Sequence, residues 1–281
     1  DSALLYDTML HYKKEDEYLK YEGRVTMVGN FSEAFAGIFS GLLAVYSLRL
    51  PFYAQSGIAF IGIPAAVALT EHAAKTRIKN SFANIVQIIQ YSLFTNKELC
   101  YNIMFSGVIG AATLTMAWFV QPLLIELDTP TSWFGIIWTI LNLTVGISAL
   151  YSDKLDQRLG SLRMYTLILF FIVGGYIAVA FNISYIGLVC LFFFYIVRGF
   201  ATPILKGYIN QITFSEMRAT VLSIRNFIIR LMFAAMAPLV GWLHDLYSLS
   251  IALQATAAII FVPGLLFLIL QYRYKPRETS L

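Results

Sequence analysis

The sequence is short of charge. Of its 281 residues, only 13% are Asp, Glu, Lys or Arg, whereas 58% are hydrophobic. A soluble domain is typically about 25% charged and about 45–50% apolar. A soluble enzyme of this composition could not cover its surface with polar groups, so the composition indicates a polytopic membrane protein.

Cysteine and histidine are scarce as well. The 2 cysteines, Cys100 and Cys190, are too few and too far apart for a disulfide framework or a metal site. The 3 histidines are scattered, which gives zinc binding no support. No Gly-x-x-x-x-Gly-Lys loop points to ATP hydrolysis. We therefore expect no metal, no cofactor and no enzyme activity.

Long uncharged or nearly uncharged stretches predict eight membrane-spanning helices. A bilayer core about 30 Å thick requires about 20 apolar residues per helix. The predicted spans are 25–47, 50–70, 99–125, 129–152, 164–181, a following helix that ends at about 205, 219–243 and 246–272. These runs are too long for the strands of a membrane barrel. The predicted fold class is all-α, a polytopic helical membrane protein.

The basic residues are distributed unevenly about these spans. Of the 20 Lys and Arg residues, Arg49 alone lies on one side, and Arg198, Arg225 and Arg230 lie within spans. All the others lie on the side of both termini. The net charge of +4 therefore reflects loops on one side of the membrane, and it does not indicate a nucleic-acid partner. The positive-inside rule then predicts a multi-pass protein of the plasma (inner) membrane, with both termini in the cytoplasm.

One long connection, residues 71–98, separates two predicted spans from six. It contains an amphipathic stretch with Ile85, Ile89 and Leu93 on one face. Such a stretch is expected to lie along the membrane surface.

Short motifs occur at the ends of several spans. They are Arg158-Leu159-Gly160 with Asp153 upstream and Gln157 in place of an acidic residue, Gly241-Trp242-Leu243-His244-Asp245, Arg198-Gly199 with Pro203, and Arg218-Ala219-Thr220. Together with the span count and loop lengths, these motifs resemble the major facilitator superfamily of secondary transporters. Members of that family have twelve helices in two halves of six, joined by a long cytoplasmic loop.

The resemblance implies a domain organisation. Residues 1–70 look like the end of helix four with helices five and six, 71–98 like the connecting loop, and 99–281 like the C-terminal half. The first four helices of the same protein are then missing partners of this chain. The resemblance also implies alternating access for a small-molecule substrate, and it marks Asp153, Arg158, Gly160 and Arg218 as gating-loop candidates.

Ionisable residues within spans are the first candidates for transport, because a charge at mid-membrane is costly and normally faces protein or water. Glu33 is either a proton-coupling or substrate-binding carboxylate or one held by a salt bridge near the cytoplasmic end. Gly37 lies on its face and is expected to permit close helix contact. The spans that would be helices six, nine and twelve, which are peripheral in the family, carry no charge.

The other candidates lie in later spans. Arg230 shares a polar stripe with Asn226 and is expected to face the cavity, where it would suit an anionic group or pair with an acid. Arg225 points elsewhere and is expected to snorkel to the cytoplasm. Arg198 is interpreted either as a gating residue or as a bridge to a neighbouring loop or helix end. Asn142 and Gln121 are uncharged polar residues within spans. Each is expected either to bind substrate or to form a hydrogen bond between helices.

The sequence thus predicts a secondary active transporter of a small solute, driven by a proton or other gradient across the lipid bilayer. Three alternatives stay open. They are a passive facilitator of the same family, a fragment that does not transport, and a polytopic membrane enzyme. The enzyme is disfavoured because no cluster of His, Asp or Glu occurs at a membrane face.

Overall fold

The computed structural model describes residues 2–47, 49–68 and 82–274, and every regular element in this part is helical. The helices are α1 (Ser2–His11), α2 (Tyr18–Tyr46), α3 (Leu50–Val67), α4 (Phe82–Gln90), α5 (Lys97–Glu126), α6 (Thr131–Ala149), α7 (Ser152–Leu159), α8 (Ser161–Phe181), α9 (Tyr185–Gln211), α10 (Ser215–Leu246) and α11 (Leu249–Tyr274). A 3₁₀ turn (Glu15–Glu17) precedes α2, and a π-helical turn (Tyr91–Thr95) follows α4.

Several of these helices are suited to a membrane. In the described part, α5, α8, α9, α10 and α11 are long and apolar enough to cross it, which makes 5. The count rises to 6 if α6 and α7, which meet at a bend of 49°, form one span. The expected all-α, membrane-spanning fold is confirmed to this extent. The helices α2 and α3 are not among these 5, so the count of eight spans stays a prediction.

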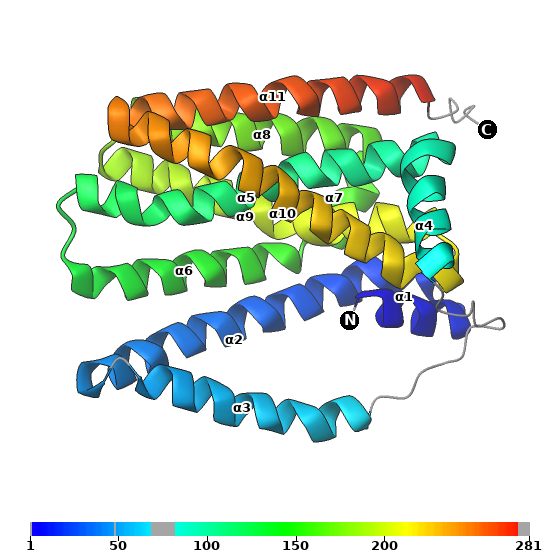
Figure 1. The fold of residues 1–281 in the computed structure, drawn as a ribbon, viewed down its shortest axis with the longest axis horizontal. Helices are drawn as coiled ribbons and strands as arrows, with labels where there is room; N and C mark the ends of the chain where they lie inside the picture. Colours follow the sequence, from blue (N-terminus) through cyan, green and yellow to red (C-terminus); the bar gives the residue numbers. More distant parts are fainter. Residues whose placement is uncertain (1, 48, 69–81, 275–281) are drawn as a thin grey trace.

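The long helices pack side by side (Figure 1). The core lies between α5, α8, α9 and α11, where Tyr176, Phe194 and Leu253 are almost completely buried. The Tyr176 hydroxyl donates a hydrogen bond of 2.6 Å to the Ala112 carbonyl, which pairs this buried polar atom. Helix α2 packs along α6 and α9, whereas α3 meets α2 at its N-terminal end and then diverges from it (Figure 1).

Glycines allow α6 to approach two neighbouring helices closely. A Cβ atom on Gly23 of α2 would lie 2.3 Å from the Ala149 carbonyl oxygen, and one on Gly199 of α9 would lie 2.6 Å from the Val145 carbonyl oxygen. At Gly37 of α2 the approach to α6 is less close: a Cβ atom there would lie 3.8 Å from the Thr139 hydroxyl, which is an ordinary van der Waals distance.

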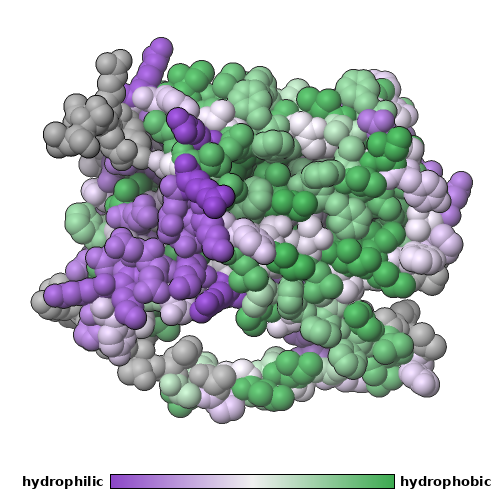
Figure 2. Space-filling model, turned by 180° about the vertical axis from the view of Figure 1, so that it is seen from behind, coloured by the Kyte–Doolittle hydropathy of each residue, from purple (hydrophilic) through white to green (hydrophobic). Residues whose placement is uncertain are grey.

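Polar residues gather at one end of the molecule, and the rest of the visible surface is largely apolar (Figure 2). We call this the basic end; it holds α1, α4, α7 and the last turn of α11. Helix α4 runs across the ends of the bundle helices, the direction expected for a helix at a membrane surface (Figure 1). Its Ile88 and Ile89 pack on a cluster from α5 and α10. The first part of the predicted connection, 71–81, lies outside the described residues.

Candidate functional site

Two adjoining hollows lie halfway along the bundle. The first, of about 710 Å³, is lined by α5, α9 and α10, and we call it the arginine hollow. The second, of about 530 Å³, is lined by α2, α5, α6 and one residue of α9, and we call it the Glu33 hollow. They share Leu114, Trp118 and Arg198 as common wall. Both have volumes in the range of ligand sites, about 300–1,000 Å³.

Arg198 lies at the midpoint of α9, since the helix continues past the predicted end to Gln211. Its side chain lines both hollows. The guanidinium carbon is 5.3 Å from the centre of the Tyr195 ring, in cation–π geometry. The Nη1 atom is buried and has no hydrogen-bond partner among the described residues. The bridge to a neighbouring loop, one of the two readings of the sequence, is absent from the described part of the chain.

Arg225 is buried inside the bundle, so the prediction that it snorkels to the cytoplasm was wrong. Its Nε atom donates to the Ser106 hydroxyl of α5 at 2.5 Å, and its Nη1 atom donates to the Asn226 amide oxygen at 3.0 Å. The physical reason is that α10 packs on α5 with this face inward. A hydroxyl and an amide within reach then replace the water that snorkelling would have supplied.

Arg230 and Asn226 share one stripe of α10, and both line the arginine hollow. Arg230 is at the middle of α10 and is exposed to the hollow. It forms no hydrogen bond or ion pair with any residue that the structure describes. Trp118 of α5 and Phe233 of α10 stack at a centroid distance of 6.5 Å and form an aromatic part of the wall.

Glu33 lies midway along α2 and lines the Glu33 hollow together with Gln121 and Arg198. Within the described residues it has no ion-pair partner within 4.0 Å, so the salt bridge near the cytoplasmic end is not found there. Asn142 lines neither hollow. It is buried, and its Nδ2 atom donates to the Trp138 carbonyl one turn earlier at 3.1 Å. The structure therefore separates Asn142 from the other candidates.

The basic end of the bundle is closed by a buried polar network that the sequence analysis missed. The Glu22 carboxylate of α2 is completely buried and lies 3.0 Å from Lys206 Nζ of α9. It also accepts hydrogen bonds from Ser2 at 2.8 Å and from the Tyr18 hydroxyl at 3.1 Å. Asn210 of α9 donates to the same Tyr18 hydroxyl at 2.8 Å. The network ties α1 and α2 to α9.

Arg218 ties α1 to α10 in the same region. Its side chain is buried, forms an ion pair with Asp7 and donates to the Thr213 carbonyl at 2.7 Å. The guanidinium lies 4.2 Å from the centre of the Tyr6 ring. Burial raises the pKa of the Tyr6 phenol, and the neighbouring Arg218 cation opposes that rise only in part. The gating-loop candidate Arg218 is therefore located at a contact between helices.

The remaining gating-loop candidates surround α7. Gly160 ends this helix with a φ of +74°, a left-handed conformation that favours glycine. The Asp153 carboxylate accepts a hydrogen bond from Gln157 at 2.9 Å, and Arg158 is exposed in the last turn. A neighbouring acid, Asp156, accepts a hydrogen bond from the Tyr208 hydroxyl of α9. This contact joins α7 to α9, which is the helix that also carries Arg198.

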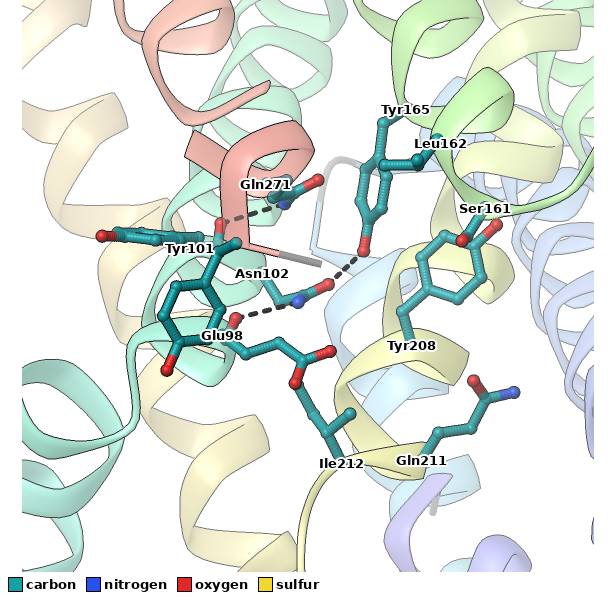
Figure 3. A pocket seen from close by; sticks show the side chains of 11 residues that line it. Glu98, Tyr101, Asn102, Ser161, Leu162, Tyr165, Tyr208, Gln211, Ile212 and Gln271 are labelled. Carbon is teal, nitrogen blue, oxygen red and sulfur yellow. Dashed lines mark hydrogen bonds between the residues drawn. The ribbon is translucent and has the colours of Figure 1, made fainter. Parts of the chain in front are cut away.

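A third, much smaller pocket of about 70 Å³ lies at the basic end between α5, α8, α9 and α11 (Figure 3). Its polar residues largely satisfy one another. Asn102 donates to the Glu98 carbonyl at 2.9 Å and accepts from the Tyr165 hydroxyl, and Gln271 donates to the Tyr101 carbonyl at 3.3 Å. A buried water molecule needs about 10–15 Å³ of cavity volume, so this pocket has room for ordered water.

The residues that bear on function thus fall into two groups, one around the hollows and one at the basic end. Glu22 and Asp7 were missed because they precede the first predicted span and were not counted as membrane residues. The described part of the chain contains no group of three His, Cys, Asp or Glu residues that could hold a metal ion. A comparison with protein-family models found no family that matches this chain, and a search of curated proteins found no match either.

Proposed function

We propose that this chain belongs to a secondary active transporter that moves a small solute by alternating access, in the manner of the major facilitator superfamily. The observation that carries the proposal is the position of four ionisable side chains. Glu33, Arg198 and Arg230 lie at the midpoints of their helices and face the two hollows, and Arg225 lines the same site. Charges at membrane depth normally mark a substrate or ion pathway, and transporter sites lie near the midplane.

The identity of the helices that line the hollows supports the same proposal. Their walls come from α2, α5, α6, α9 and α10, and α3, α8 and α11 contribute no residue. On the resemblance to the family, α3, α8 and α11 correspond to helices six, nine and twelve, which are peripheral there. We therefore count α2, α3, α5, α6, α8, α9, α10 and α11 as the eight membrane spans.

The closed basic end supplies the second element of alternating access. The Glu22–Lys206 and Asp7–Arg218 pairs join α1 and α2, which we assign to the N-terminal half, to α9 and α10 of the C-terminal half. On the positive-inside rule the basic end is cytoplasmic, so this arrangement is closed toward the cytoplasm. Rocking of the halves would have to break both pairs. The open faces of the hollows would be covered by further helices of the same protein.

The experiment that tests the proposal is a flux measurement with the complete protein in liposomes. A panel of labelled small solutes is offered under an imposed pH gradient, with protein-free liposomes as the blank. We expect at least one solute to accumulate above equilibration and to be lost when an ionophore collapses the gradient. Equilibration without accumulation would identify a passive facilitator, and the absence of any flux would contradict the proposal.

A further inference from the structure

The arginine hollow carries an excess of positive charge. Arg198, Arg225 and Arg230 all line it, and no acidic residue does. Two acids lie outside it: Glu33 lines the adjoining hollow, which shares Arg198 as wall, and Glu22 at the basic end is close enough to Arg225 to interact with it electrostatically. Among the described residues, none of the three arginines forms an ion pair with a carboxylate. Cations at this depth in a membrane need a compensating partner.

The three guanidinium groups differ in how many of their N–H donors already have a hydrogen-bond acceptor in the protein. Arg225 is held in place, because Ser106 and Asn226 accept from its Nε and Nη1 atoms. Arg198 keeps a buried Nη1 donor without a partner. Arg230 has no partner among the described residues. A buried charged donor without an acceptor is costly, and Arg198 and Arg230 both line the hollow, so an anion bound there would supply the acceptor that the described residues do not.

The geometry points to a small organic anion as the transported solute, with its carboxylate or phosphate group bound by Arg198 and Arg230. This inference rests on the proposed function and names the substrate class of the same site. Planar guanidinium groups bind carboxylate and phosphate oxygens through paired hydrogen bonds. Asn226, oriented by Arg225, offers its amide group beside them. Arg225 is in this sense a positioning residue.

Apolar residues of the same hollow suit the rest of the solute. Trp118 and Phe233 stack on each other, and Ile229 and Leu114 line the hollow beside them. An anion with an apolar or aromatic body therefore fits better than an inorganic ion. The volume of about 710 Å³ leaves room for a molecule of metabolite size.

The test is a binding measurement on the complete purified protein with four matched probes. They are phenylacetate, phenyl phosphate, the neutral phenylacetamide and the cationic phenethylammonium. Binding is followed by titration calorimetry and by the shift in melting temperature. We expect one or both anions to bind and the neutral and cationic probes to bind at least tenfold more weakly. The stronger of the two anions distinguishes a carboxylate from a phosphate solute.

Variants locate the binding. Arg230→Gln and Arg198→Gln should each weaken anion binding at least tenfold, and Arg230→Lys should weaken it less, because the charge remains and the planar fork is lost. Arg163→Gln, which removes an exposed arginine at the start of α8, is the matched control and should bind as the unchanged protein does. Elution as a single species in size-exclusion chromatography shows that each variant is folded.

Two results would overturn the inference. One is equal binding of the cationic or neutral probe, and the other is unchanged anion binding in folded Arg198→Gln and Arg230→Gln. The flux assay separates this inference from the proposed function. Transport restricted to a neutral or cationic solute would refute the anionic substrate and would be consistent with the proposed transport function. Anion binding in the hollow without flux of any solute would refute the transport function and would be consistent with an anion-binding site.

Discussion

At the scale of single residues, the basic end depends on Glu22, whose carboxylate is completely buried and paired with Lys206. Removing one partner of a buried pair leaves an uncompensated charge, which costs about 3–5 kcal/mol when both partners are fully buried. The Lys206 side chain is 25% exposed, so water relieves part of this penalty. Lys206→Met should therefore lower the free energy of unfolding by about 2–3 kcal/mol, measured by denaturant titration in detergent.

The control for this prediction is Lys20→Met. Lys20 forms an exposed pair with Glu17 at 3.7 Å, and exposed pairs are worth about 0–1 kcal/mol. The double variant Glu22→Gln with Lys206→Met should be less destabilised than the single variant at Lys206, because no buried charge is left behind. Equal losses for Lys206→Met and Lys20→Met would show that the buried pair does not stabilise this end.

Glu33 is the residue to which we assign the coupling role. Glu33→Gln keeps the size and polarity of the side chain and removes its titration. We expect this variant to exchange solute across liposomes at a rate within about threefold of the unchanged protein, which is about 0.7 kcal/mol. Accumulation driven by a pH gradient should be lost. Glu216→Gln, at an exposed acid in the first turn of α10, is the control and should keep both activities.

An unchanged gradient-driven accumulation in Glu33→Gln would remove Glu33 from the coupling mechanism.

A helical stripe in the sequence put Arg230 and Asn226 on one face of α10, and both line the arginine hollow. It failed for Arg225, since rotation of α10 against α5 decides whether a guanidinium finds Ser106 or water. It also missed the partners of Lys206 and Arg218. Lys206 follows Glu22 by 184 positions, and no local pattern indicates a contact at that separation. Only the packing of α2 on α9 brings the two together.

At the scale of helices, the contact between α6 and α9 depends on Gly199. A Cβ atom there would lie 2.6 Å from the Val145 carbonyl oxygen, and a backbone atom cannot move aside as a side chain can. Gly199→Ala should force the two helices apart and cost about 1–3 kcal/mol, the usual cost of overpacking. The measurement is the thermal unfolding midpoint in detergent, and we expect a clear decrease.

Gly174→Ala on α8 is the matched control for that substitution. Nothing lies within 4 Å of a Cβ atom at this position, and the residue is exposed. Its melting temperature should stay constant or rise slightly, because alanine favours a helix over glycine. Equal melting temperatures for the two alanine variants would contradict a close α6–α9 contact.

Hydropathy predicted the location of the long helices well and their ends poorly. The span predicted to end at about 205 is a helix that runs to Gln211, and the span predicted from 219 begins at Ser215. Apolar runs report the thickness of the bilayer core, whereas helices continue into the polar region beyond it. The same limit hid α7, an eight-residue polar helix in what looked like a loop.

At the scale of the whole molecule, the proposed alternating access depends on two features that lie at different depths. The hollows lie halfway along the helices, and the pairs of Glu22 with Lys206 and of Asp7 with Arg218 close the basic end. The sequence pointed to the first feature, because charged residues in apolar spans are rare. The second could not be read from it, since closure depends on the angle between α2 and the helices α9 and α10.

The most direct test of the central claim is whether the arginine hollow is open to water from one side and then from the other. Thr113 lines it and is close to cysteine in size. Thr113→Cys is made in the complete protein with Cys100 and Cys190 replaced by serine, and a membrane-impermeant thiol reagent is added to vesicles from each side. Phe171→Cys, at an exposed apolar position on α8, is the control.

We predict labelling of Thr113→Cys from the side opposite the basic end, and new labelling from the basic-end side when Lys206→Met is added. Phe171→Cys should stay unlabelled from both sides. A cysteine at position 113 that is unreactive from both sides, with and without Lys206→Met, would contradict the account, because the hollow would then not be an aqueous pathway.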